Sequence, residues 1–276
     1  MNTQGTAPRF SQQDVTAALG EAAQYLGSGT FGDTWRAGNQ AVKIICVDNY
    51  PRERLEREVE GLTRVRSPQV VALIGTDEIL LGGKLRPILR FEYIEGGDVD
   101  KKVQEKNLLP ASEVSHFLRG LLLGVKALHE TSTIHRDIKP GNIALRSGEW
   151  SSPVLLDLGL AKQLDGTSIT VYPGFIGTAR YMAPEQLRAQ RARKAADLWS
   201  VGVTVREVLT GSHPFYVDGQ NYSVDEAIRK LSDGPSAVGV DIPDGVREVL
   251  DRLTAFEEFE RGSVSSNLTR LDRAGV

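Results

Sequence analysis

The alternation of apolar and polar positions predicts short strands in the first part of the chain. From Tyr25 to Val47, β-like runs are broken by glycines, and the segment AVKIICV (residues 41–47) is the clearest strand because it is apolar and β-branched. The segment LRPILRFEYI (residues 85–94) is predicted to be another strand. One amphipathic helix is predicted between them, beginning at Pro51, because proline suits a first helical turn. Its apolar positions recur at helical spacing: Leu55, Val59, Leu62 and Val65.

After a glycine-rich connector at residues 95–98, the pattern changes to long helices. Residues 197–209 are apolar around most of the circumference, which predicts a helix buried in the centre of this part, stopped by Gly211. The chain is therefore predicted to fold as a strand-rich part followed by a larger, mostly helical part. A second, amphipathic helix is marked by Val114, Phe117, Leu118, Leu121, Leu122, Val125 and Leu128.

Length and composition allow two lobes that share a cleft. The 276 residues are 40% hydrophobic and 25% charged, which is ordinary for a globular protein. With 33 basic and 36 acidic side chains, the formal net charge is −3, so nucleic acid is disfavoured as a partner. A single cysteine, Cys46, and only four histidines exclude an internal disulfide framework and zinc-ligand spacing, and they fit a reducing compartment.

The N-terminal segment MNTQGTAPRFSQQ is polar and lacks the apolar core of a signal peptide, and residues 1–18 are expected to form a loose tail. The most apolar helix, HFLRGLLLGVKAL, is interrupted by Arg119 and Lys126 well short of a membrane span. The sequence therefore predicts no targeting segment, no membrane insertion and a cytoplasmic location.

The segment LGSGTFGDT carries Gly27, Gly29 and Gly32 in a G-x-G-x-x-G pattern. Because glycine has no side chain, backbone N–H groups in such a segment can approach phosphate oxygens closely. The dinucleotide-binding form of this motif continues directly into a helix, whereas residues 34–45 here have the pattern of two strands. The context favours a glycine-rich flap over a nucleotide, with a plain hairpin turn as the alternative.

Lys43 lies in the run AVKII, which is expected to be buried. A buried ammonium must be paired or it loses its proton, and Glu58, on the polar side of the following helix, is the predicted partner. A lysine held in a cleft by Glu58 presents its charge to nucleotide phosphates. The alternative for Lys43 alone is a strand-edge charge that prevents aggregation.

The segment IHRDIKPGN (residues 134–142) follows a predicted helix and therefore lies in a loop, and LLDLG follows it along the chain. Transfer of the γ-phosphoryl group of ATP requires neutralisation of clustered negative charge, an aligned acceptor hydroxyl and an oxygen that takes its proton. Asp137 can accept that proton, Lys139 can neutralise the transferring group, and Asn142 and Asp157 offer hard oxygen ligands for Mg²⁺. Each residue alone is explained as well by a solvated loop charge, but their joint occurrence at this spacing is not.

With these motifs in this order, residues 20–265 resemble a eukaryotic-type (Hanks-type) Ser/Thr protein kinase catalytic domain. The matching segments are the glycine-rich segment, Lys43, Glu58, FEYIEGGD, HRDIKPGN, DLG, GTARYMAPE, DLWSVG and LTGSHPF. The resemblance implies an α+β, bilobal protein-kinase fold. A small antiparallel β-sheet N-lobe with one main helix is expected at about residues 19–95, and a larger, mostly helical C-lobe at about residues 96–270, within a single domain spanning residues 1–276.

Further residue roles are implied by this resemblance alone. Phe91 would be the gatekeeper, Ala41 would touch the adenine ring, and backbone groups around Glu92 and Tyr93 would bind adenine. Asp98 would meet the ribose.

The resemblance also assigns residues that serve the fold rather than the chemistry. Glu185 and Arg261 stand where such kinases form a structural ion pair in the large lobe. His135 stands where the family has a structural side chain, so it is not expected to be a catalytic base.

Lys139, close after Asp137, and Thr178 in GTARY resemble the serine/threonine-specific kinases. The resemblance implies an ATP-dependent enzyme that uses Mg²⁺, with Mn²⁺ as an alternative, and that phosphorylates protein substrates and itself. A kinase-shaped, non-catalytic scaffold or binding module is one alternative, although such proteins usually lack the equivalents of Lys43, Asp137 or Asp157. A small-molecule kinase is another, against which GTARYMAPE and DLWSVG argue. The candidate self-phosphorylation sites are Thr167, Ser168 and Thr170.

Overall fold

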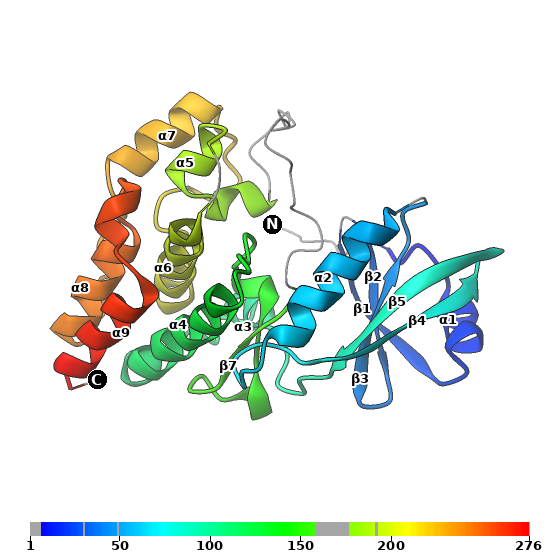
Figure 1. Cartoon of the computed structure of the whole chain (residues 1–276). Coiled ribbons are helices and arrows are strands. Elements are labelled where there is room, and N and C mark those ends of the chain that lie inside the picture. The colour runs from blue at the N-terminus through cyan, green and yellow to red at the C-terminus, as the bar shows by residue number, and fades with distance from the viewer. Residues whose placement is uncertain (1–6, 30, 49, 158–176, 191–192, 276) are drawn as a thin grey trace. The chain divides into compact units, whose positions relative to one another are not determined.

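The computed structural model of the chain describes residues 7–29, 31–48, 50–157, 177–190 and 193–275. The chain divides into two compact units, one formed by Met1–Arg66 and Val71–Tyr93 and the other by Ser67–Val70 and Ile94–Val276 (Figure 1). Within the described residues, the first unit holds an antiparallel sheet and the second is mostly helical, which confirms the predicted fold class. No helix in the described part of the chain is long and apolar enough to cross a membrane.

Among the described residues of the first unit, five antiparallel strands form a sheet in the order β1-β2-β3-β5-β4. The strands are β1 (Ala23–Ser28), β2 (Gly32–Ala37), β3 (Gln40–Ile45), β4 (Leu73–Leu81) and β5 (Lys84–Glu92). One face of this sheet supplies the core of the unit, where Trp35, Val42, Ile44 and Ile88 are buried. The predicted amphipathic helix is α2 (Arg52–Arg64), with Pro51 as its N-cap.

The first helix, α1 (Gln12–Leu19), corrects the expectation of a loose tail over residues 1–18. Ser11 caps it by accepting a hydrogen bond from the Asp14 N–H, and Gly20 ends it with a φ of 72°. The helix packs on β1 and β4 (Figure 1) and buries Val15 in the core of the sheet. Its apolar positions Val15, Ala18 and Leu19 share one face and pack on this core, but they span only five residues, which is too short a run for the pattern alone to reveal the helix.

The second unit is built around α6 (Lys194–Thr210), which is buried along nearly its whole length and ends at Gly211 as predicted. Gly202 lets α8 approach, because a Cβ there would lie 2.8 Å from the Cβ of Leu253. Two short strands, β6 (Ile143–Leu145) and β7 (Pro153–Leu155), pair antiparallel. The other helices of the described residues are α3 (Val99–Gln104), α4 (Val114–Glu130), α5 (Pro184–Leu187), α7 (Val224–Ser232), α8 (Asp244–Leu253) and α9 (Val264–Arg273).

The predicted ion pair between Glu185 and Arg261 is confirmed. The Arg261 guanidinium donates to both carboxylate oxygens of Glu185, at 2.8 and 2.9 Å. Its carbon lies 4.9 Å from the ring centre of Trp199, on α6. The pair therefore joins the end of the GTARYMAPE segment to the buried central helix.

Candidate functional site

The glycine-rich segment connects β1 to β2 in the first unit. Its turn is closed by a hydrogen bond of 2.8 Å from the Gly29 N–H to the Gly32 carbonyl. Gly32 is glycine for a packing reason, because a Cβ there would lie 1.8 Å from the carbonyl oxygen of Ile44 on β3. Any side chain at Gly32 would force β2 and β3 apart.

Packing does not explain the other two glycines of the motif. A Cβ on Gly27 would meet nothing within 4 Å, and one on Gly29 would meet only the Gly32 carbonyl, at 3.8 Å. Neither residue has the left-handed backbone that favours glycine. The space beside Gly27 and Gly29 is open, as close approach of a ligand to the backbone requires.

Lys43 lies on β3, where its register partners are Thr34 on β2 and Leu89 on β5. It is buried, with 7% of its surface exposed, as the sequence pattern predicts. Its predicted partner Glu58 belongs to α2, but the side chain at that position lies outside what the structure describes. The pairing of these two residues stays a prediction.

The end of β5 carries the residues assigned to adenine. Ala41 on β3 pairs with Phe91, so these two positions lie side by side in the sheet. The N–H of Glu92 donates to the Ala72 carbonyl at 3.0 Å, and the N–H of Tyr93 donates to the Asn39 carbonyl at 3.2 Å. Because both N–H groups are occupied, adenine contacts at Glu92 and Tyr93 would come from their carbonyl oxygens.

In the second unit, the segment IHRDIKPGN is a loop that ends in a short 3-10 turn, Pro140–Asn142. One buried carboxylate on α6, Asp197, holds its first half. Asp197 accepts hydrogen bonds from the N–H of His135 at 2.9 Å and from the N–H of Arg136 at 2.8 Å, and it contacts His129 Nε2 at 2.8 Å. The sequence pattern does not predict this role of Asp197, although an aspartate in the first turn of an otherwise apolar buried helix is a visible signal.

His135 is fully buried, and both of its ring nitrogens are engaged. Nδ1 accepts from the N–H of Asp137 at 3.3 Å, so Nε2 carries the proton and donates to the Leu156 carbonyl at 2.9 Å. The ring has no nitrogen left to take a proton from a substrate. This arrangement agrees with the expectation that His135 serves the fold.

Three of the predicted site residues meet in this loop. Lys139 Nζ donates to Asp137 Oδ2 at 3.1 Å, and Asn142 Nδ2 donates to the same oxygen at 3.0 Å and to the Asp137 backbone carbonyl at 2.8 Å. The Asp137 carboxylate is therefore held in a fixed orientation by a cation and an amide. Because the Asn142 nitrogen is used in this way, its amide oxygen is the atom left to act as a ligand.

Asn142 and Asp157 lie at the same end of the β6–β7 pair. Ile143 pairs with Leu155, and the Leu156 N–H donates to the Asn142 carbonyl at 2.8 Å. Asp157 follows directly with a positive φ of 45°, an unusual conformation for a residue other than glycine. An amide oxygen and a carboxylate in this position fit Mg²⁺, which binds few protein ligands and completes its shell with water and substrate phosphate.

Asp98, assigned to the ribose, caps α3. Its Oδ1 accepts a hydrogen bond of 2.8 Å from the Lys101 N–H, and its backbone bridges to Ala144, the residue in the middle of β6. Burial, and after it the charge of Asp98, raise the pKa of the neighbouring Asp100. One oxygen of Asp98 is thus committed to the fold, and a ribose contact would fall to the other.

The described end of GTARYMAPE is held by buried polar groups. The Tyr181 hydroxyl donates to Glu207 Oε2 on α6 at 2.6 Å, and burial raises the pKa of Glu207 to about 7. The ring of His213 donates through Nε2 to the Arg180 carbonyl at 3.0 Å, and burial lowers the His213 pKa to about 3, so it stays neutral. The side chain of Thr178 and the residues Thr167, Ser168 and Thr170 lie outside the described part of the chain.

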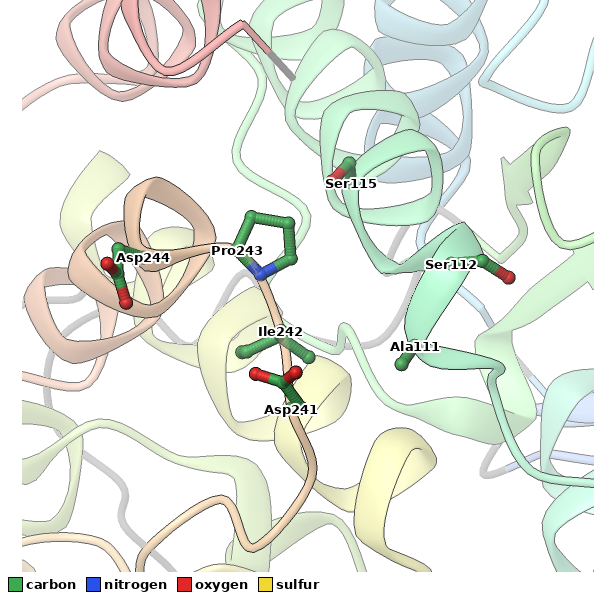
Figure 2. Close-up of a pocket in the computed structure, with 7 residues that line it drawn as sticks. All are labelled: Ala111, Ser112, Ser115, Asp241, Ile242, Pro243 and Asp244. Carbon is green, nitrogen blue, oxygen red and sulfur yellow. The ribbon is translucent and has the colours of Figure 1, made fainter.

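A separate surface pocket of about 490 Å³ lies in the second unit (Figure 2). It is lined by Ala111, Ser112 and Ser115 around the start of α4, and by residues 241–244 around the start of α8. Its polar groups are the hydroxyls of Ser112 and Ser115 and the carboxylates of Asp241 and Asp244. None of the predicted site residues lines this pocket, so it is not part of the candidate site.

Comparison with known proteins gives a consistent result. Residues 21–270 match the family model described as a protein kinase domain. The chain is 33% identical to the serine/threonine-protein kinase ATG1c of Arabidopsis thaliana over 74% of its length, and 33% identical to the inhibitor of nuclear factor kappa-B kinase subunit beta of Bos taurus over 84%. It is 32% identical, over 82% of its length, to the probable serine/threonine-protein kinase PkwA of Thermomonospora curvata. These matches cover 28%, 32% and 30% of the relatives, so the chain spans about a third of their length.

Among solved structures, the crystal structure of Rad53 1-466 in complex with AMP-PNP matches with a TM-score of 0.71. The match covers 90% of this chain and 63% of the other, at 24% sequence identity. It confirms the predicted bilobal fold.

Proposed function

Because the chain belongs to the protein kinase family, we propose that it transfers the γ-phosphoryl group of ATP to serine and threonine hydroxyls of proteins, itself included. The observation that carries this proposal is the geometry around Asp137, whose carboxylate is oriented by Lys139 and Asn142 in a loop fixed by Asp197. Phosphoryl transfer depends mainly on positioning and on electrostatic stabilisation, so a rigidly held base and cation are the parts that it needs.

Each residue then has a defined task. Asp137 orients the acceptor hydroxyl and takes its proton, while Lys139, within hydrogen-bond reach of Asp137, offsets negative charge on the transferring group. Asn142 and Asp157 would hold Mg²⁺, or Mn²⁺ as the alternative, and this ion supplies charge neutralisation at the phosphates.

In the first unit, the proposal is that the backbone of Gly27, Gly29 and Gly32 binds the ATP phosphates. Lys43 would bind them as well, with Glu58 as its ion-pair partner. The open space beside Gly27 and Gly29 supports this assignment, since the fold alone gives no reason for glycine there. Ala41, the carbonyls of Glu92 and Tyr93, and Asp98 would contact adenosine. The lobes are proposed at about residues 19–95 and 96–270, and the cytoplasm is the proposed location.

The proposal is tested by replacing the base. Asp137→Ala should lose about 10² to 10⁴ in phosphate transfer from Mg-ATP to a generic protein substrate, the loss typical for a positioned base. Lys43→Met should do comparable damage through the phosphates. Asp272→Ala, which removes an exposed aspartate of α9 that pairs with Arg119, is the matched control and should keep wild-type activity.

Phosphoamino-acid analysis of the labelled substrate and of the chain itself identifies the acceptor. Phosphoserine and phosphothreonine are expected, and phosphotyrosine alone would refute the assigned specificity. If neither Asp137→Ala nor Lys43→Met lowers transfer, the activity does not belong to this chain, and the alternative of a kinase-shaped binding module is favoured.

A further inference from the structure

The chain segment that precedes α1 contacts the glycine-rich segment through Arg9. The Arg9 backbone N–H donates to Asp33 Oδ2 at 2.7 Å, and its guanidinium pairs with Asp33 Oδ1. The same guanidinium donates through Nη2 to the carbonyl of Gly29 at 2.9 Å. One arginine from outside the sheet therefore contacts both the glycine turn and the first residue of β2 after Gly32.

Asp33 is the centre of this arrangement. Its surface is 0% exposed, although it carries a carboxylate. Ser28, which stands between Gly27 and Gly29, donates through Oγ to Asp33 Oδ1 at 2.7 Å, and Ser28 and Asp33 are register partners across β1 and β2. A buried carboxylate is costly unless it is paired and hydrogen-bonded, so the stability of this turn depends on Arg9.

Arg9 is itself held by the start of α1. Its neighbour Phe10 packs so closely on the β4–β5 turn that a Cβ on Gly82 would lie 2.7 Å from the ring, and the Arg86 guanidinium lies 4.9 Å from the ring centre. Ser11 then caps the helix, and Val15 is buried in the core. The segment around Arg9 is therefore anchored in the same unit as the glycine-rich segment.

We propose that Arg9 is a positioning residue for nucleotide binding, which holds the glycine-rich segment in place through Asp33 and Gly29. This inference rests on the proposed function, because it assumes that the segment binds ATP phosphates. A segment with three glycines loses much conformational entropy when a ligand orders it. Holding the segment before ATP arrives reduces that cost, and the Arg9 charge also offsets the negative charge of Asp33, which is hydrogen-bonded to the turn through Ser28.

Arg9→Ala tests the inference against a matched control. Arg270→Ala removes another arginine that pairs with a carboxylate, and both arginines have 39% of their side-chain surface exposed. Arg9→Ala should raise the KM for ATP and the Kd for Mg-ADP by about three- to tenfold, since the lost ion pair is partly exposed. The kcat at saturating ATP should change by less than about twofold, and Arg270→Ala should leave all three values unchanged.

Two further measurements separate positioning from general stability. Arg9→Lys keeps the charge, but one ammonium does not reach Asp33 and Gly29 in the way a planar guanidinium does, so an intermediate KM is expected. Hydrogen exchange in the nucleotide-free protein should be faster at residues 27–34 in Arg9→Ala than in the wild type, and unchanged in β5. A lowered melting temperature with unchanged KM and Kd would overturn the inference.

The exchange measurement also distinguishes this inference from the proposed function. If the wild type binds no Mg-ADP and transfers no phosphate, the proposed function is wrong. Faster exchange at residues 27–34 in Arg9→Ala would even then show that Arg9 holds the segment, and equal exchange in both proteins would refute it.

Discussion

Removal of the carboxylate at Glu185 should strongly destabilise the second unit. Arg261 has 0% of its side-chain surface exposed, and its guanidinium carries a charge that cannot reach water. In Glu185→Gln the shape of the side chain is kept, but the countercharge is lost. The variant therefore isolates the electrostatic contribution of the pair from its packing.

The magnitude follows from the partners of Arg261. Besides the two bonds to Glu185, the guanidinium donates to the carbonyls of Ala255 at 2.9 Å, Phe256 at 2.9 Å and Ala195 at 3.3 Å. Breaking a buried ion pair by removing one partner costs about 3–5 kcal/mol, because the other charge stays buried and uncompensated. The three carbonyl contacts keep the arginine in place, so it cannot relieve the cost by turning outward.

Urea unfolding followed by tryptophan fluorescence measures this loss, since Trp199 lies against the guanidinium. The free energy of unfolding should fall by about 3–5 kcal/mol in Glu185→Gln. Glu248→Gln, which removes the carboxylate of the exposed pair with Arg270, should cost less than about 1 kcal/mol. A loss below about 1 kcal/mol in Glu185→Gln would mean that other groups compensate the remaining charge of Arg261, and it would refute this reasoning.

Two more predictions concern other parts of the chain. Gly32→Ala should destabilise the fold by about 2–3 kcal/mol in thermal unfolding, because its Cβ would lie 1.8 Å from the Ile44 carbonyl oxygen. Gly27→Ala is the control and should cost less than about 0.5 kcal/mol, because its Cβ would meet nothing within 4 Å. Equal losses in the two variants would refute the packing argument. Burial raises the pKa of Glu207 from its ordinary value of 4.5 to about 7 in the folded chain. Between these two pH values the folded state binds a proton that the unfolded state has lost, so the free energy of unfolding falls as pH rises through this range. Urea unfolding of the wild type and of Glu207→Gln at pH 5 and pH 8 measures this effect. The loss of free energy of unfolding between the two pH values should be smaller in Glu207→Gln by about 1–3 kcal/mol, and an equal loss in both proteins would contradict the prediction.

The sequence predicts best where one physical requirement dominates a whole segment. The core helix α6 needs apolar residues around its circumference, and the order of the residues alone displays that requirement. The proximity of Asp137, Lys139 and Asn142 is predicted in the same way, because the proposed phosphoryl transfer would require these groups close together. In both cases the residues that satisfy the requirement are neighbours along the chain.

Segments that are stabilised by a few distant contacts are not predicted in this way. The pattern does not reveal β4, because its middle residues Thr76, Asp77 and Glu78 are polar and exposed, and pairing with β5 rather than alternation defines it. It does not reveal α1 either, because the apolar positions of that helix that pack on the core, Val15, Ala18 and Leu19, span only five residues. A pattern of apolar positions records burial, so it does not detect elements held mainly by backbone pairing or by a few side chains.

Strand periodicity predicts that Asp33 is buried, but it does not predict which residue pairs with it. Side chains in a strand alternate between faces, so Asp33 shares the face of Trp35 and Ala37, which are buried in the core. This alternation places a carboxylate on the buried face of β2, and burial of a carboxylate requires a cation nearby. The sequence therefore predicts that Asp33 has a cationic partner, but it does not indicate which of the 33 basic side chains this partner is. Only the packing of Phe10 and α1 on the sheet selects Arg9, which is why a segment that resembles a loose tail becomes part of the proposed nucleotide site.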